Sequence, residues 1–131
     1  MKIAILLPFK DTYTKDKAGS ASIWVKDFIK NSKSKKKITI YGHIKNLDKN
    51  KLINKNNYVN INYNFDFYIG SKNKKYVQIF NNLIKNKSIG LIELHNRPNY
   101  IDYLDKKLKK IIVFHNDPLK LKGSEKLNER I

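Results

Sequence analysis

Short apolar runs alternate along this chain with segments whose apolar residues recur at helical spacing, and this alternation is the feature that most constrains the fold. Continuous apolar runs bounded by proline, glycine or polar residues predict strands, and the run that proline ends at 2–7 predicts a buried one. Four such runs occur, at residues 2–7, 38–41, 89–94 and 111–114. Residues 58–63 alternate apolar side chains with asparagine instead, which predicts a half-exposed edge strand.

The segments between the strands predict helices and a loop. The first helix has apolar residues at positions i, i+3, i+4, i+7 and i+8, namely Ala21, Trp24, Val25, Phe28 and Ile29. Either Ser20 or Ser22 can cap its amino end. Two further helices are predicted at 75–86 and 99–108, whereas the polar, asparagine-rich stretch 43–57 predicts a loop.

Strands that alternate with helices predict an α/β fold with a doubly wound, mainly parallel, Rossmann-like sheet, because right-handed crossovers place helices on both faces. In the commonest arrangement the first strand is central, beside the strand that ends at Leu94, and the strand that ends at Phe114 comes next. With 131 residues the chain has room for one domain. We expect this domain to span 1–123, with the start of a helix at 124–131 where a longer protein is interrupted.

Two polar strings follow predicted strands, one after 89–94 and the other after 111–114. They are His95-Asn96-Arg97-Pro98 and His115-Asn116-Asp117-Pro118. Residues just past the carboxyl ends of parallel strands line the ligand crevice, and neighbouring strands lie about 4.8 Å apart. We therefore expect both strings, together with the small-residue turn at Gly19, to converge on one polar binding site.

The residue types in this predicted site have specific uses. His95 can hydrogen-bond a sugar hydroxyl or a phosphate, or act as a general base. Arg97 is one of only two arginines in a lysine-rich chain and can form a forked pair with a carboxylate or phosphate. Gly19 and Ser20 precede a predicted helix, whose amino end favours a phosphate. The second hydrogen-bonding corner consists of His115, Asn116 and Asp117.

Purely structural roles compete with each of these interpretations. The histidines can be satisfied inside the strand ends, and Arg97 can be an ordinary surface residue. Gly19 can belong to a tight loop with a helix cap. Asp117 and Pro118 together are typical of a turn. These alternatives stay open at the level of the sequence.

Metal binding is not predicted. The chain has no cysteine, which excludes disulfides and thiolate metal sites. A zinc site from His95, His115 and Asp117 is conceivable, but the spacing matches no metal motif. His43 follows a strand and a glycine without a distinctive polar neighbour, and we interpret it as a surface residue.

The net charge of +17 is the most extreme value of the composition, with 28 lysines and arginines against 11 acidic residues. The lysines are spread along the chain among many asparagines and isoleucines, which is typical of AT-rich coding bias. We therefore interpret the charge as a statement about solubility and nonspecific binding. The densest cluster, 33–37, predicts a solvated turn. No signal peptide or membrane span is predicted, so we expect a cytoplasmic protein.

The chain resembles the amino-terminal domain of a known family, the retaining glycosyltransferases of the GT-B fold, family 4 type. These enzymes are also called glycosyl transferases group 1. The resemblance covers nearly the whole sequence. Its sharpest parts are the two polar strings with the strand residues before them, at 92–98 and 112–118. Weaker parts are the opening run 2–7, the loop 19–21, Val25 and Phe28, the strand 38–42, and Gly123 with Ser124.

The resemblance implies one half of a two-domain enzyme, in which the amino-terminal domain binds the acceptor and the carboxyl-terminal domain binds most of a nucleotide-sugar. Transfer would proceed with retention, without a cofactor or essential metal. By analogy, Gly19 and Ser20 would approach the donor phosphates or the acceptor, and His95 would contact the transferred sugar. The remaining donor- or acceptor-binding residues would be Asn96, Arg97, His115, Asn116 and Asp117. The paired-glutamate motif of the donor domain is absent from this chain, so we expect it to be inactive by itself.

The expected partners follow from this resemblance. They are a nucleotide-sugar and a glycan or lipid-linked acceptor, in cell-envelope polysaccharide or lipopolysaccharide synthesis. A basic surface would favour peripheral contact with the inner, anionic face of the membrane. Two alternatives are a free-standing domain that binds a small anion or nucleotide without catalysis, and a basic nucleic-acid-binding module. The second would use tyrosines interleaved with lysines, but no nucleic-acid partner is expected.

Overall fold

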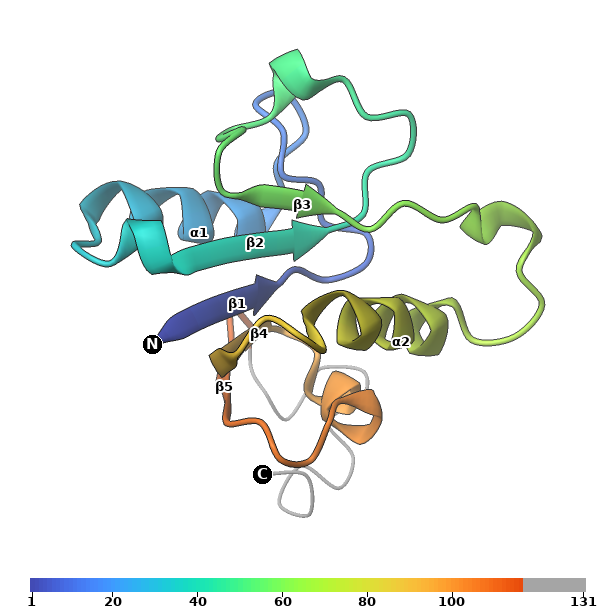
Figure 1. The fold of residues 1–131 in the computed structure, drawn as a ribbon. Coiled ribbons are helices and arrows are strands. Elements are labelled where there is room, and N and C mark those ends of the chain that lie inside the picture. Colours follow the sequence, from blue (N-terminus) through green and yellow to red (C-terminus); the bar gives the residue numbers. More distant parts are fainter. Residues whose placement is uncertain (117–131) are drawn as a thin grey trace.

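A parallel sheet of five strands organises residues 1–116, the part of the chain that this computed structural model describes (Figure 1). The strands are β1 (Lys2–Leu6), β2 (Ile38–Gly42), β3 (Tyr58–Asn60), β4 (Ile89–His95) and β5 (Lys110–Val113). Their order in the sheet is β3-β2-β1-β4-β5, and every pairing is parallel. The predicted Rossmann-like α/β fold is therefore confirmed, including the central first strand with β4 and then β5 beside it.

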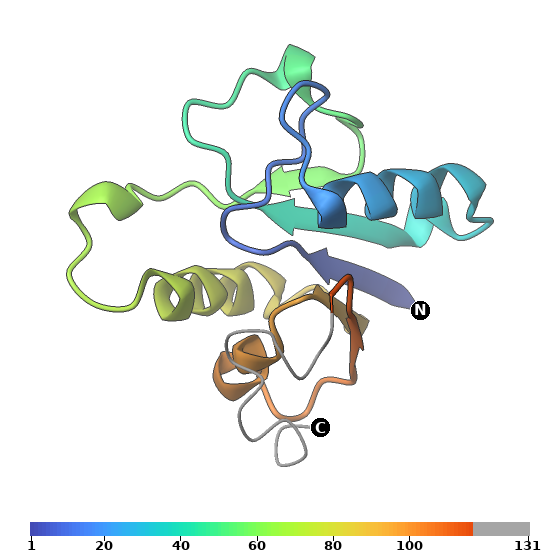
Figure 2. The same ribbon diagram turned by 180° about the vertical axis from the view of Figure 1, so that it is seen from behind.

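Two helices cover opposite faces of the central strand, α1 (Ser20–Asn31) and α2 (Lys72–Ile84). Ile5 and Leu7 pack in one apolar cluster with α1, while Ala4 and Leu6 pack in a second cluster with α2. Figure 2 shows α1 in front of β2 when the sheet is seen from behind. Because β1 is buried on both faces, its apolar run has no polar position, as is typical of central parallel strands.

Several boundaries differ from the sequence predictions. The predicted helix 99–108 is only a 3₁₀ turn, η4 (Pro98–Tyr103), because the chain turns at Asp105 and enters β5 by Lys110. Tyr100 and Leu104 still reach the core from this turn. The second helix starts at 72 instead of 75, since Ser71 Oγ accepts a hydrogen bond from the Lys74 amide and caps it.

Smaller differences affect the loops. The predicted edge strand 58–63 keeps its edge position, but its pairing to β2 covers only Tyr58–Asn60. Three short 3₁₀ turns occur in segments without a predicted element: η1 (Lys35–Lys37), η2 (Lys49–Lys51) and η3 (Phe65–Phe67). The expected helix start at 124–131 lies outside the described residues. Within residues 1–116, no helix has the length and apolar character needed to cross a membrane.

The predicted serine cap of α1 is wrong, because Asp11 from the preceding loop takes that role. The N-cap residue is Gly19, which has no side chain to offer. The Asp11 carboxylate accepts hydrogen bonds from the amides of Gly19 (3.2 Å) and Ala21 (3.1 Å) and from Ser22 Oγ (2.5 Å). A Cβ at residue 19 would lie 2.6 Å from an Asp11 oxygen, so glycine is required by this close approach.

We predict that Asp11→Ala destabilises the fold by about 2 kcal/mol, because three donors lose their acceptor at a helix amino end. Urea unfolding followed by circular dichroism measures this loss. Asp27→Ala, an exposed acidic position on the same helix, is the matched control and should change the unfolding free energy by less than about 0.5 kcal/mol. Equal effects of the two variants would contradict the capping role of Asp11.

Candidate functional site

A chain of hydrogen bonds at the carboxyl edge of the sheet links three titratable side chains. Glu93 Oε2 lies 2.8 Å from His95 Nε2, and His95 Nδ1 lies 2.8 Å from His115 Nε2. The two imidazole rings are stacked, with centroids 5.1 Å apart and planes 17° from parallel. His95 and His115, which the sequence places 20 residues apart, therefore meet as predicted.

The alternation of side chains along β4 explains how this chain of bonds forms. Ile92 and Leu94 face the cluster under α2, so Glu93 and His95 share the other face. His95 is 1% exposed and Glu93 is 4% exposed. A buried carboxylate needs a hydrogen-bonding partner, and His95 supplies it. The neighbouring residue across the β1–β4 ladder is the apolar Ile5, which leaves the Glu93–His95 pair in dry surroundings.

Asn96 fastens the ends of β4 and β5 to each other. Its amide donates to the Val113 carbonyl (3.1 Å), and its Oδ1 accepts from the His115 amide (2.7 Å). The residue has a φ of 54°, in the left-handed region that asparagine tolerates better than most residues. Arg97 Nη1 donates to the Asn96 carbonyl (2.7 Å), which folds the arginine back along the same corner.

Trp24 of α1 packs against the histidine pair. Its ring centroid lies 5.1 Å from that of His95 and 6.1 Å from that of His115. Phe28, which the helical spacing predicted to be buried, is 37% exposed and stacks on Trp24 at 5.1 Å. The apolar stripe of α1 thus extends beyond the core, because Trp24 packs on the histidine pair and Phe28 packs on Trp24.

Burial lowers the pKa of His115 below its ordinary value of 6.5, and the neighbouring His95 lowers it further, whereas Asp11 and Glu93 raise it. His115 is therefore neutral at pH 7. One arrangement of the ring protons satisfies both bonds. His95 Nε2–H donates to Glu93, and His115 Nε2–H donates to His95 Nδ1. In this arrangement His115 Nδ1 has no hydrogen-bond donor among residues 1–116 and can accept a hydrogen bond from a hydroxyl group.

Gly19 and Ser20 lie at the amino end of α1, for which the sequence left open a phosphate contact or a tight loop with a helix cap. The structure places the Asp11 carboxylate on the first amides of that helix. A phosphate at this position would have to displace a carboxylate that already fills the same electrostatic role. Ser20 is exposed and caps nothing.

A cleft of about 600 Å³ is lined by two more of the predicted residues, Arg97 and Asn116, which follow His95 and His115 in the sequence. Its other lining residues come from the loop after β1, the first turn of α2 and the start of η4: Phe9, Lys10, Lys72, Asn73 and Asn99. The sequence analysis did not identify these five residues. Lys10 and Lys72 carry no local signal in a chain with this many lysines, so only the fold reveals their proximity.

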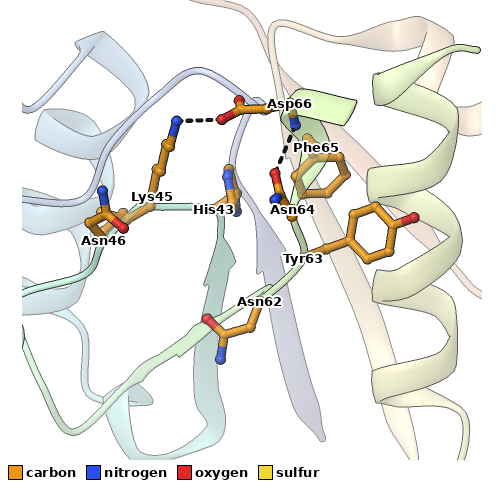
Figure 3. A pocket seen from close by; sticks show the side chains of 9 residues that line it. His43, Lys45, Asn46, Asn62, Tyr63, Asn64, Phe65 and Asp66 are labelled. Atoms are coloured by element: carbon orange, nitrogen blue, oxygen red, sulfur yellow. Dashed lines mark hydrogen bonds and ion pairs between the residues drawn. The ribbon is translucent and has the colours of Figure 1, made fainter. Parts of the chain in front are cut away.

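A second, smaller cavity of about 290 Å³ lies past the ends of β2 and β3 (Figure 3). The interpretation of His43 as a surface residue is wrong, because this half-buried side chain lines the cavity between Phe9 and Phe65. Its Nδ1–H donates to the Ile61 carbonyl (2.8 Å). Figure 3 shows the ion pair between Lys45 and Asp66 joining the two segments that form this cavity.

Three residues of the histidine site were not singled out from the sequence: Asp11, Trp24 and Glu93. Glu93 had a detectable signal, since it is a carboxylate inside an otherwise apolar run that predicts a buried strand. Asp117 lies outside the described residues, and with it the conceivable zinc site. Within the described range, no group of three or more histidine or acidic side chains is arranged to hold a metal ion.

We predict that stability falls as the pH drops below about 6.5, because the unfolded state then protonates His115 while the folded state resists protonation. The contribution is fully present above pH 6.5 and is lost on acidification. Urea unfolding between pH 7.5 and 5 measures the slope, which His115→Gln should reduce and the exposed Lys36→Gln should leave unchanged. Identical slopes in wild type and His115→Gln would exclude His115 as its source.

No protein-family model, curated protein or solved structure matches this chain. The established result is a small, Rossmann-like α/β domain with a parallel sheet of order 3-2-1-4-5 and polar residues gathered at its carboxyl edge.

Proposed function

We propose that this chain is the acceptor-side half of a retaining GT-B glycosyltransferase, transferring a sugar from a nucleotide-sugar to a glycan or lipid-linked acceptor. The observation that carries the proposal is the direct hydrogen bond between His95 and His115 at the carboxyl edge of the sheet. It brings together the two polar strings that give the sequence its resemblance to this family. Cell-envelope polysaccharide or lipopolysaccharide synthesis in the cytoplasm is the setting that the resemblance implies.

The chemistry of the site suits a carbohydrate. Sugars present many hydroxyl groups, which pair with side chains that both donate and accept hydrogen bonds. His115 offers an acceptor nitrogen, and Trp24 beside it offers a flat apolar surface for the face of a sugar ring. Because Glu93 fixes the orientation of His95, and His95 that of His115, the acceptor nitrogen is preorganised.

A second candidate function is binding of a small anion or nucleotide without catalysis. The cleft beside Arg97 favours it, because cationic and amide side chains line that cleft. The two candidates differ in whether the domain must bind a neutral sugar. A glycosyltransferase domain must recognise the sugar's hydroxyl groups at the histidine pair, whereas an anion-binding domain need not.

We predict that neutral saccharides bind at the histidine pair and that His115→Gln weakens this binding about tenfold, or 1.4 kcal/mol. The measurement is a two-dimensional NMR titration with methyl glycosides of common hexoses and with UDP-glucose. His43→Gln is the matched control, since it removes an imidazole from the other cavity, and it should change the affinity less than twofold. An absence of saturable shifts near residues 93–96 with every saccharide would refute the proposal, as would equal losses in both variants.

We further propose that this domain contacts an anionic membrane through an apolar tip, defined as Phe67 and Ile69. These side chains are 84% and 95% exposed, in the segment between β3 and α2 that extends beyond the sheet (Figure 1). Lysines follow on the first turn of α2, and Lys75 Nζ lies 5.1 Å from the ring centroid of Tyr63. Exposed apolar residues next to lysines match the apolar interior and anionic surface of a bilayer.

The lysine cluster at 33–37 is a less suitable membrane contact. Lys35–Lys37 form η1, which leads into the amino end of β2 and so lies at the edge of the sheet opposite the histidine site. The apolar tip precedes α2, whose first residues line the cleft at the site edge. A lipid-linked acceptor would therefore approach the site from the tip.

We predict that the double variant Phe67→Ser, Ile69→Ser lowers binding to vesicles of phosphatidylcholine with 30% phosphatidylglycerol by at least tenfold. Burial of each side chain contributes roughly 1.5–3 kcal/mol. The triple variant Lys35→Gln, Lys36→Gln, Lys37→Gln removes more charge and should have the smaller effect. Cosedimentation with these vesicles, and with phosphatidylcholine alone, measures both. A larger loss in the triple variant, or no binding by the wild type, would refute the role of the tip.

A further inference from the structure

The cleft lined by Lys10, Lys72 and Arg97 lies where the strand order reverses. From β1 the chain proceeds to β2 and β3 on one side and to β4 and β5 on the other, so the point between β1 and β4 is the switch point of the sheet. Ligands of open parallel sheets bind at the carboxyl side of such a point. The cleft meets this condition, since it is bordered by the segments that follow β1, β4 and β5.

The charged side chains that line the cleft are all positive. Three cations line it, from three different segments, and no carboxylate is among its described lining residues. The ion pairs within residues 1–116 involve Lys45, Lys51 and His95, so none of the three cleft cations forms a direct ion pair with a described carboxylate, although the charge of Lys72 helps to lower the pKa of Asp66. Arg97 uses one guanidinium nitrogen on the Asn96 carbonyl, which orients the group and leaves further donors.

Neutral donors complete the surroundings. The hydroxyl of Tyr100 accepts from the Phe9 amide (3.0 Å) and donates to Asn73 Oδ1 (3.1 Å). Burial raises the pKa of Tyr100 to about 12, so the phenol keeps its proton at neutral pH. Because Tyr100 occupies the amide oxygen, the Asn73 amino group remains as a donor. The amino end of α2 adds positive potential, and its first turn contains no acidic residue.

We propose that this cleft binds the phosphate group of a phosphate ester, carried by a sugar or a nucleotide. Cations on three segments with amide donors between them match the several oxygens of a phosphate. The volume exceeds that of a free phosphate and falls in the range of small-molecule sites, so the phosphate is attached to an organic group. The inference rests on the second candidate function and deepens it, because it names the chemical class of the anion that the cleft binds.

The test is isothermal titration of the full chain with glucose 1-phosphate, UDP, inorganic phosphate and methyl glucoside, at 50 and 150 mM NaCl. The phosphate esters should bind most tightly and methyl glucoside should not bind at this cleft. Tighter binding of glucose 1-phosphate identifies a sugar as the carrier, and tighter binding of UDP identifies a nucleotide. Salt should weaken the binding of both esters.

Three variants, each of which removes one positive charge, distinguish binding at this cleft from nonspecific electrostatic attraction to a basic protein. Arg97→Gln and Lys72→Gln should each lower the affinity for the phosphate esters at least fivefold. Lys36→Gln, at the opposite edge of the sheet, should lower it less than twofold. Lys72 is exposed, so its variant tests the site even if the Arg97 variant folds poorly.

Two results would overturn the proposal: the same loss in Lys36→Gln as in Lys72→Gln, and methyl glucoside binding that Lys72→Gln weakens as much as it weakens glucose 1-phosphate binding. Phosphate-ester binding that persists while neutral saccharides fail to bind at the histidine pair would refute the glycosyltransferase proposal and leave the anion site intact. Binding of neutral saccharides at the histidine pair, without binding of phosphate esters at the cleft, would refute the anion site alone.

Discussion

The parallel direction of every strand is the constraint on which the rest of this domain depends. Because the strands run the same way, their carboxyl ends meet at one edge, and residues far apart in the sequence become neighbours there. The interior of the sheet is closed to polar chemistry, since Ala4, Ile5 and Leu6 of the central strand have no exposed surface. The histidines, the asparagine that fastens them and the cationic cleft all lie at this edge.

The sequence predicted well those features that depend on local pattern or on sheet topology. Continuous apolar runs identified β1, β2, β4 and β5, although β5 is an edge strand without a fully buried residue, and the asparagine alternation identified the edge strand β3. The meeting of His95 with His115 followed from two strand ends in adjacent positions, without knowledge of any side-chain conformation. The length of η4 was overestimated, because the apolar positions Tyr100 and Leu104 suit a short 3₁₀ turn as well as a helix.

Features that depend on contacts between distant segments were not predictable in this way. A serine beside a helix start looks like a cap, but the acceptor came from Asp11 in a loop eight residues before Gly19. The two long helices consequently present different amino ends. In α1 a carboxylate already balances the partial positive charge, whereas α2 keeps a serine cap and lysines. No periodicity in the sequence distinguishes these two cases, although they determine which helix can face an anion.

The position of Trp24 provides an optical probe of the site. It is the single tryptophan of the chain, so all indole emission originates from one ring. That ring packs against both histidines and is only partly buried. An imidazolium quenches a nearby excited indole more strongly than a neutral imidazole does, and a ligand covering the ring changes its exposure to water. The emission spectrum of the unlabelled protein therefore reports the protonation and the occupancy of the histidine pair.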